Sequence, residues 1–563
     1  MELIVARSGE QRWAVRAIGT ASFTETGLTA AELAGKAARW ETELNPRWVF
    51  PSVERDYPVL LDAGVRIGRC HDLSLAEGLL LADEGLHDHS RGLAAAHARA
   101  TGLEPPPETR QAHPELDEQP TLFDPRDSGL PADVSAVDAA AIVLAGQHER
   151  VEALGTAARM RLLIAAESAS ALAAAEMSAD GLPWRADVHD RLLTELLGDR
   201  VAPGSRPAKL AQLAARVQQA LGGKPLNIDH PGSVVRAFGR AGIAIPSARA
   251  HVLRTLDHPA VSPLLEYKEL ARLHSAHGWT WLDHWVHDNR FRPVFVVGGV
   301  VSGRWASRGG AALQIPRVLR ACVRADPGWK LVVADAAQLE PRILAALSGD
   351  RGLADVAAAT DLYSSLAEAM FPATASADVD GNGDDRARAK IAMLSAMYGG
   401  TAGEAASLLA LLRQRFPAAV SYVENAAVKG ERGELVRSRL GRTSPPPSQA
   451  WRALTGGTGN EDKARRAARE WGRFTRNFVV QASAADWTAV LLALLRQRLP
   501  REAHLVFFQH DEVLVHTPAA LAEEVTACLG AAVAETTALV FGSACPVRFP
   551  MPAAVVDCYA DAK

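Results

Sequence analysis

Apolar stretches interrupted by polar residues predict a mixture of strands and helices along this chain. Short strand-like runs occupy the first 82 residues, at Leu3–Ala6, Trp13–Ile18 and Val59–Leu61. Apolar residues then recur at helical spacing through residues 144–177 and 264–275. Strand patterns return at 291–307, 329–339, Leu505–Phe508, Val513–His516 and Ala553–Val556. The chain is therefore expected to be a helix-rich α/β (α+β) protein, and its 563 residues are enough for several domains.

The segment 83–135 differs in kind from its neighbours. It is rich in proline and acidic residues, as in "EPPPETRQAHPELDEQPTLFDPRDSGLP". Such a composition buries little apolar surface, so the segment is expected to be a loop or linker within the N-terminal region.

Composition places the protein among soluble globular chains, with 48% hydrophobic and 22% charged residues. A net charge of −4 does not indicate a nucleic-acid binder. Such a protein could still gather its basic residues on one face. The five cysteines are scattered, odd in number and not at metal-ligand spacing. The first residues carry no export signal pattern, and no apolar run has the length of a membrane span. A cytoplasmic protein without a membrane partner is expected.

Two neighbouring carboxylates interrupt an apolar stretch near the C-terminus. In "LVFFQHDEVLVHTP", His510-Asp511-Glu512 separates two strand patterns and predicts a hairpin turn. Ionised carboxylates are costly to bury unless something pairs with them. Either this is a solvated surface turn, or its acids hold metal ions.

A second apolar strand also ends in an acid. In "LVVADAAQLEPR" the strand leads into Asp335, and Glu340 follows. Alone, Asp335 is more typical of a helix N-cap after a strand. Together with Asp511, it supplies the strand-end carboxylates that a two-metal phosphoryl-transfer site requires.

The segment "RARAKIAMLSAMYGG" predicts a helix with cations and an aromatic ring on one face. Arg386, Lys390, Leu394 and Tyr398 recur at every fourth position. Cations on this face would bind a triphosphate, and the ring would support a base. The alternative is a solvated basic helix with a tyrosine in the core.

These motifs, in this order, resemble those of the family A DNA polymerases. The family pattern D-Y-S-Q-I-E-L-R is similar to Asp335 through Arg342, R-x-x-x-K with a later Y-G matches Arg386, Lys390, Tyr398 and Gly399, and H-D-E matches His510-Asp511-Glu512. Weaker landmarks are "SGRWASRGGAALQIPR" with Arg304, "EYKELARLHS", and "RFTRNFVVQASAAD" with Arg473, Asn477, Gln481 and Asp486. The resemblance covers about 150 to 560.

The resemblance implies a right-hand polymerase domain at 149–563, with its thumb at about 149–298, its palm at about 299–345 and 478–563, and its fingers at about 346–477. The implied activity is template-directed DNA synthesis from a primer 3′-hydroxyl by two-metal phosphoryl transfer, in DNA repair or gap filling.

Residue roles follow from the same resemblance. Asp335, Asp511 and the Ala336 carbonyl would bind two Mg²⁺ ions, for which Mn²⁺ would substitute, and Glu512 would support this catalytic site. Expected nucleotide-binding residues are Arg386, Lys390, Leu394, Tyr398, Gln338 and Glu340, the last excluding ribonucleotides. Expected DNA-binding residues are Arg304, Arg473, Asn477, Gln481 and His510.

Several positions depart from the family pattern. Ala336 and Ala337 replace the usual Tyr and Ser, and Pro341 follows Glu340 at a helix start. Leu394 stands where the family carries an aromatic residue tied to sugar discrimination. These departures bear on fidelity, speed and sugar selection more than on the reaction itself.

The N-terminal residues 1–148 resemble a ribonuclease-H-like 3′–5′ exonuclease domain that has degenerated, with 83–135 as an insert. Asp56 and Asp138 match two of its acids, but Val134 replaces an expected Tyr and the leading D-x-E motif is absent. Proofreading is therefore not expected.

Expected partners are primer–template DNA and dNTPs, with the protein as a monomer. Within the insert, "QPTLF" resembles the peptide that bacterial proteins insert into the sliding clamp, with Gln119, Leu122 and Phe123 as anchors. An alternative function is a non-catalytic, polymerase-like DNA-binding scaffold tethered to the clamp.

Overall fold

The computed structural model describes residues 1–19, 22–106, 129–308, 314–371, 382–400, 403–457 and 460–562. The clamp-type peptide with Gln119, Leu122 and Phe123 lies outside these ranges. The chain forms two compact units: unit 1 holds Met1–Ala179, Val294–Ala306 and Val332–Ala554, and unit 2 holds Asp180–Pro293, Ser307–Leu331 and Val555–Lys563.

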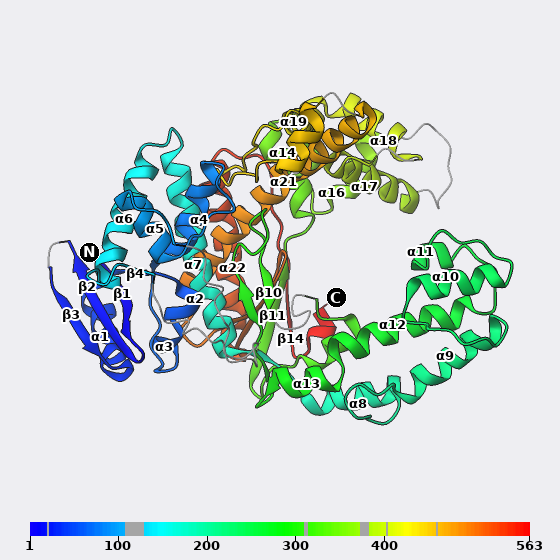
Figure 1. Ribbon diagram of the computed structural model, residues 1–563, viewed down its shortest axis with the longest axis horizontal. Coiled ribbons are helices and arrows are strands. Elements are labelled where there is room, and N and C mark those ends of the chain that lie inside the picture. The colour runs from blue at the N-terminus through cyan, green and yellow to red at the C-terminus, as the bar shows by residue number, and fades with distance from the viewer. Residues whose placement is uncertain are drawn as a thin grey trace. The chain divides into compact units, whose positions relative to one another are not determined.

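Unit 1 begins with a five-stranded sheet in the order β3-β2-β1-β4-β5 (Figure 1). Its strands are β1 Glu2–Gly9, β2 Arg12–Ile18, β3 Thr24–Leu28, β4 Arg47–Phe50 and β5 Cys70–Asp72. Strand β1 pairs antiparallel with β2 and parallel with β4, and β4 pairs parallel with β5. The first two strand predictions, Leu3–Ala6 and Trp13–Ile18, are confirmed.

Helices α1 Ala30–Leu44, α2 Val53–Asp56, α3 Pro58–Leu61, α4 Leu73–Asp83, α5 Leu93–Thr101 and α6 Ala136–Glu152 accompany this sheet. The core places Ile4 and Val49 of the sheet against Val137 and Leu144 of α6. The strand prediction for Val59–Leu61 is wrong, because these residues form α3, whose first position is a proline with its φ already helical.

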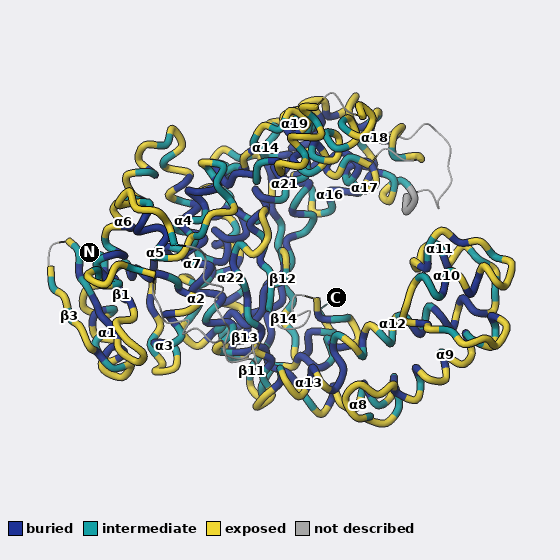
Figure 2. Tube along the Cα trace, in the orientation of Figure 1, coloured by how far each residue is buried: buried dark blue, intermediate teal, exposed yellow. Residues whose placement is uncertain are grey.

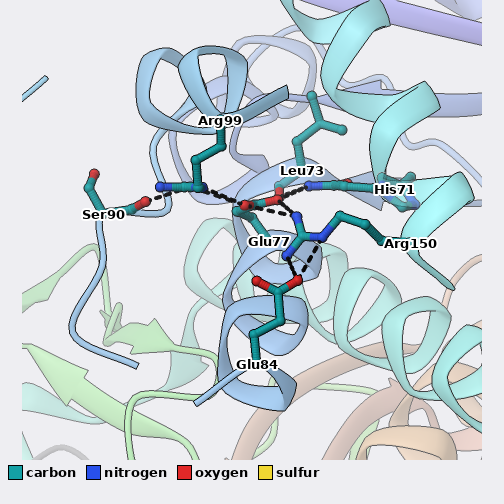
Figure 3. A network of polar contacts seen from close by, with 8 residues as sticks. His71, Leu73, Glu77, Glu84, Ser90, Arg99 and Arg150 are labelled. Carbon is teal, nitrogen blue, oxygen red and sulfur yellow. Dashed lines mark hydrogen bonds and ion pairs between the residues drawn. The ribbon is translucent and has the colours of Figure 1, made fainter. Parts of the chain in front are cut away.

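A network of buried polar contacts holds α4, α5 and α6 together (Figure 3). Glu77 of α4 is 1% exposed and accepts hydrogen bonds from Arg99 of α5 at 3.1 Å and from Arg150 of α6 at 2.9 Å. Gln147 of α6 donates to the same carboxylate at 3.1 Å. Helix α5 lies inside the range expected to be a loop or linker, so that expectation is wrong for Leu93–Thr101, where buried alanines pack the helix into the core.

A second sheet has four strands in the order β12-β13-β11-β14, namely β11 Trp329–Asp335, β12 His504–Gln509, β13 Glu512–Pro518 and β14 Ala553–Val556. The predicted strands at 329–339 and in the last segment are confirmed. Short strands β9 Val294–Val296 and β10 Ala306–Arg308 confirm the strand pattern at 291–307.

The remaining helices of unit 1 carry most of the other motif residues. They are α7 Ala157–Asp180, α14 Leu339–Ser348, α15 Arg351–Val356, α16 Leu362–Met370, α17 Asn382–Tyr398, α18 Ala405–Arg415, α19 Pro417–Glu431, α20 Gln449–Gly456, α21 Glu461–Arg498 and α22 Ala522–Phe541. The helical pattern from Arg386 to Tyr398 is confirmed by α17.

Unit 2 is mainly helical, with α8 Ala186–Leu197, α9 Ala208–Ala220, α10 Pro231–Arg240, α11 Ala250–Leu253, α12 Val261–His277 and α13 Trp279–Trp285. Short strands β6 Leu182–Pro183, β7 Val286–His287 and β8 Arg290–Phe291 form a small sheet. Trp184, Trp281 and Phe291 pack as an aromatic core, with ring centroids 4.9–5.7 Å apart. The helix expected at 264–275 is part of α12.

Among the described residues, three helical segments are long and apolar enough to cross a membrane by length and composition, contrary to the expectation from the sequence. In Ala157–Asp180 and Glu461–Arg498, 72% and 78% of the apolar window is buried inside the protein (Figure 2). Burial in the core accounts for the apolar character of these two helices. In Ala519–Phe541 only 28% of the window is buried.

Candidate active site

The structure brings Asp335 and Asp511 together, although they are far apart in the sequence. Asp335 is the last residue of β11. Gln509 pairs with Glu512 across β12 and β13, so His510 and Asp511 form a two-residue turn, and His510 takes a left-handed φ of 58°. The backbone N–H of Ala336 donates to the carbonyl of Asp511 at 3.0 Å. This bond fixes the hairpin turn against the end of β11. The antiparallel pairing of β12 with β13 confirms the predicted hairpin.

The electrostatics of this pair differ from those of a solvated turn. Burial, together with the nearby Asp335 carboxylate, raises the pKa of Asp511 to about 6. Glu512, the next residue, is 5% exposed. A cation placed beside Asp335 and Asp511 would favour the ionised form of Asp511.

The donor atoms fit a hard divalent cation. Within the described ranges no group of three or more His, Cys, Asp or Glu side chains gathers as a metal site. The carboxylates of Asp335 and Asp511 would supply oxygen donors, as would the backbone carbonyl of Ala336 that the sequence predicts as a ligand. Oxygen ligands, few of them from the protein, are what Mg²⁺ prefers.

Glu340 is the centre of a second cluster. It lies in the first turn of α14, and its two carboxylate oxygens accept hydrogen bonds from Arg304 and, at 2.5 Å, from the Tyr398 hydroxyl. Burial and this hydrogen bond raise the pKa of Tyr398, so the hydroxyl stays protonated as a donor. Burial and the Arg304 guanidinium lower the pKa of His510. Arg304, Glu340 and Tyr398 thus form one hydrogen-bonded cluster, the Glu340 cluster, close to the hairpin turn.

The turn between β11 and α14 is held by a buried arginine. The Arg342 guanidinium is fully buried and donates to the backbone carbonyls of Ala337, Ala357, Ala359, Thr360 and Arg548 and to the side chain of Gln338. Burial and the charge of Arg548 lower the pKa of Arg342 to about 10. Gln338, at a left-handed φ of 49°, reaches Asp361 through its amide at 3.3 Å. Gln338 therefore contacts Asp361, which belongs to the cluster around Arg386.

The cations of α17 gather around two residues at the start of α16. Arg386 forms a two-point contact with Asp361, at 2.8 Å and 3.3 Å, and this contact lowers the pKa of Asp361 to about 2. Arg386 and Lys390 lie 5.8 Å and 6.0 Å from the ring centroid of Tyr363. Burial, with Glu340 nearby, raises the pKa of Tyr363 to about 12. Leu394 is half-buried on the same helix.

The residues of α21 that are predicted to contact DNA are Arg473, Asn477 and Gln481. The side chain of Arg473 lies against Gly399, where an added Cβ would come within 2.9 Å of its Cγ. Asn477 and Gln481 follow on α21. The Oδ1 atom of Asn477 is buried and has no hydrogen-bond partner among the described residues.

Sequence reasoning missed Asp361 and Tyr363. An acid at a helix start followed by an aromatic residue is a common pattern, and only the contacts with Arg386 and Lys390 distinguish this one.

The two acids of the N-terminal region have different neighbours. The Asp56 side chain is fully buried, and both its oxygens accept hydrogen bonds from Arg55, at 2.9 Å and 2.8 Å, with Arg7 of β1 a further 3.5 Å contact. Asp138, at the start of α6, is paired with Arg16 of β2. Both carboxylates are therefore neutralised by guanidinium groups.

Comparison with known proteins places the chain in a family. The family model described as DNA polymerase family A matches residues 207–551. The thermostable DNA polymerase I of Thermus caldophilus is 32% identical over 309 residues, which are 50% of this chain and 35% of that protein. DNA polymerase I of Chloroflexus aurantiacus is 27% identical over 354 residues, 55% of this chain and 35% of that protein.

A solved structure has a similar fold. The POL domain of Pol1 from M. smegmatis, in complex with DNA primer-template and dNTP, matches with a TM-score of 0.73 and 18% identity, covering 100% of this chain and 96% of that one. The chain spans about a third of the length of the curated relatives that it matches. The family model alone covers more than half of the chain, and the chain belongs to DNA polymerase family A.

Proposed function

We propose that this protein is a template-directed DNA polymerase that adds deoxynucleotides to a primer 3′-hydroxyl. The observation that carries the proposal is the Asp335–Asp511 pair, in which burial and mutual repulsion raise the pKa of Asp511 to about 6. Membership of family A and the fold shared with a Pol1 domain complexed with primer-template and dNTP support it.

In this proposal each cluster handles one part of an incoming dNTP. Arg386 and Lys390 bind the triphosphate, and Tyr363, between them and Glu340, lies beside it. Glu340, held by Arg304 and Tyr398, faces the 2′ position of the sugar and disfavours ribonucleotides. Arg473, Asn477, Gln481 and His510 contact the DNA. The primer 3′-oxygen bonds to the α-phosphorus while the bond to pyrophosphate breaks.

Asp335, Asp511 and the Ala336 carbonyl would hold two Mg²⁺ ions, which Mn²⁺ would replace, with Glu512 in support. When bound, such ions neutralise the charge that develops during phosphoryl transfer. The residues of this chain position the reactants and exclude water around them.

We further propose that the N-terminal region is a ribonuclease-H-like exonuclease scaffold without proofreading activity. Asp56 and Asp138 already have arginine partners, which compete with any metal ion. The region is also bound firmly to the rest of unit 1. Arg496 of α21 donates to Glu176 at 2.6 Å and 2.8 Å and to the carbonyls of Ile67 and Gly68 at 2.5 Å and 2.9 Å. A structural role fits these contacts.

The proposed partners are primer–template DNA and dNTPs, with the protein as a monomer in repair or gap filling. Binding to a sliding clamp through 119–123 stays a prediction from the sequence. A cytoplasmic location is proposed because all five cysteines are free thiols.

Primer extension tests the function. A labelled primer on a defined template is incubated with Mg²⁺ and either dNTPs or rNTPs, for the wild type, Asp511→Ala and, as a control, Asp138→Ala. Extension with dNTPs by the wild type and the control, lost in Asp511→Ala, is expected. A wild type that binds the DNA but never extends it would overturn the proposal in favour of a non-catalytic scaffold.

A further inference from the structure

A buried ionic cluster lies behind the turn that carries Arg304. Arg442 is 7% exposed, and its guanidinium contacts Glu167 of α7 and, at 3.0 Å, Asp486 of α21. Asp486 is fully buried, and its other oxygen accepts a hydrogen bond from Ser438 at 2.5 Å. The Ser438 hydroxyl in turn accepts from the backbone N–H of Arg442 at 2.8 Å. The two carboxylates therefore share one guanidinium, and these contacts hold the Arg442 side chain in place.

The flat face of this guanidinium packs directly on the backbone of Gly303. A Cβ at Gly303 would collide with the Nε and Cζ atoms of Arg442 and would come within 2.8 Å of Nη2. Gly303 also has a φ of +83°, so glycine is required there for two separate reasons. At the other end of the same turn, a Cβ at Gly298 would lie 3.2 Å from Glu167. The cluster thus fits against both ends of the turn 298–304.

The turn 298–304 connects the buried ionic cluster to the Glu340 carboxylate. It is closed by hydrogen bonds from Gly303 N–H to the Val300 carbonyl at 2.8 Å and from Val300 N–H to the Arg304 carbonyl at 3.1 Å. Arg304 then binds Glu340, which also accepts from Tyr398. On the far side, Trp305 packs edge-on against Phe508 of β12, with ring centroids 4.8 Å apart. A short series of packed and hydrogen-bonded groups therefore connects Arg442 to Glu340.

We propose that Arg442 is a positioning residue for sugar selection: by packing on Gly303 it fixes where Arg304 holds the Glu340 carboxylate. The inference rests on the proposed function of the Glu340 cluster. It assigns no contact between Arg442 and substrate, because the cluster is buried. Sugar discrimination then depends on a residue that is remote in sequence and does not line the nucleotide site.

Two substitutions test this without removing a buried charge. Gly303→Ala adds the colliding Cβ, and Arg442→Lys keeps the charge but replaces the planar guanidinium with a flexible ammonium. Gly349→Ala is the matched control: Gly349 has a φ of +65°, but no atom of the described residues lies within 4 Å of its added Cβ, so it carries the backbone strain without the collision.

The readouts are kcat and KM for dNTPs, the ratio of dNTP to rNTP insertion, and the melting temperature. Gly303→Ala is expected to lower the dNTP/rNTP ratio about 10-fold, because a shift of the Arg304–Glu340 contact costs part of one charge-assisted hydrogen bond. Gly349→Ala should leave the ratio unchanged. In the double variant Gly303→Ala/Arg442→Lys, the lysine can move away from the new methyl, so the loss should be smaller than the product of the single losses.

The outcomes separate this inference from the function on which it rests. A wild type without polymerase activity overturns the proposed function. An active wild type whose dNTP/rNTP ratio is the same in Gly303→Ala, Arg442→Lys and Gly349→Ala overturns the positioning role alone. A fall in melting temperature for Gly303→Ala and Arg442→Lys beyond that of Gly349→Ala, with an unchanged ratio, would make the cluster purely structural.

Discussion

Two pairs of acids in unit 1, Asp335 with Asp511 and Asp56 with Asp138, have different charged neighbours. Asp335 and Asp511 lie near each other, and burial together with Asp335 raises the pKa of Asp511 to about 6. Asp56 and Asp138 instead have arginine partners, Arg55 and Arg16. The first arrangement attracts cations, whereas in the second the protein supplies the cations itself. The comparison teaches that the partner of a carboxylate, more than its presence, decides whether it can serve a metal ion.

The largest effect is expected at the first pair. Asp335→Asn and Asp511→Asn keep the shape of the side chains but remove the charge that would hold the ions. Single-turnover extension should fall by about 1000-fold or more, while the affinity for primer–template DNA changes little. Near wild-type rates in either variant would remove the distinction between the two pairs.

The arginine partners of the second pair should matter for stability. Replacing both Arg7 and Arg55 with Ala leaves the fully buried Asp56 carboxylate without its two cations. We expect unfolding to become easier by about 2–3 kcal/mol, since breaking a buried pair is costly but these guanidinium groups are half-exposed. Urea denaturation measures this change.

Adding Asp56→Asn to that double variant provides the control. The neutral amide needs no cation, so most of the lost stability should return. If the triple variant is no more stable than the double variant, the arginines stabilise the fold through packing and not by neutralising Asp56.

Sugar selection gives a smaller effect. Glu340→Ala removes the carboxylate that Arg304 and Tyr398 hold, and ribonucleotide insertion should rise about 10- to 100-fold relative to deoxynucleotide insertion. Leu394→Tyr should raise the use of dideoxynucleotides by adding a hydroxyl near the sugar. An unchanged dNTP/rNTP ratio in Glu340→Ala would place the selecting group elsewhere.

The smallest effect is expected for the Asp56–Asp138 pair, which should contribute no exonuclease activity. A 3′-mismatched primer incubated with Mg²⁺ or Mn²⁺ and no dNTP should stay full length with the wild type. The double variant Asp56→Ala/Asp138→Ala should behave identically. Shortening by the wild type that the double variant abolishes would make the second pair a metal site after all.

The sequence predicted the elements that carry local signals. Polar residues between two apolar runs identified the hairpin at His510 and Asp511, and the spacing from Arg386 to Tyr398 identified a helical face. It failed at Val59–Leu61, where a β-branched residue suggested a strand but Pro58 begins a helix. Propensity over a few residues is too weak to decide such cases.

The remaining contacts depend on distant parts of the chain. Arg442 contacts Glu167 and Asp486, which are far away in sequence, and nothing near Arg442 marks it as buried. In the same way, Asp361 and Tyr363 are recognised as site residues only through their contacts with Arg386 and Lys390 on another helix. Pairing across the fold, which sets burial and pKa, cannot be predicted from spacing alone.

Counting bound metal ions tests the central comparison most directly. Mn²⁺ binding, measured by electron paramagnetic resonance with primer–template DNA and a non-reactive dNTP analogue, would compare the wild type, Asp335→Ala/Asp511→Ala and Asp56→Ala/Asp138→Ala. The account predicts about two bound ions in the wild type and in the second variant, and loss of both in the first. Ions that persist in Asp335→Ala/Asp511→Ala but are lost from Asp56→Ala/Asp138→Ala would contradict it.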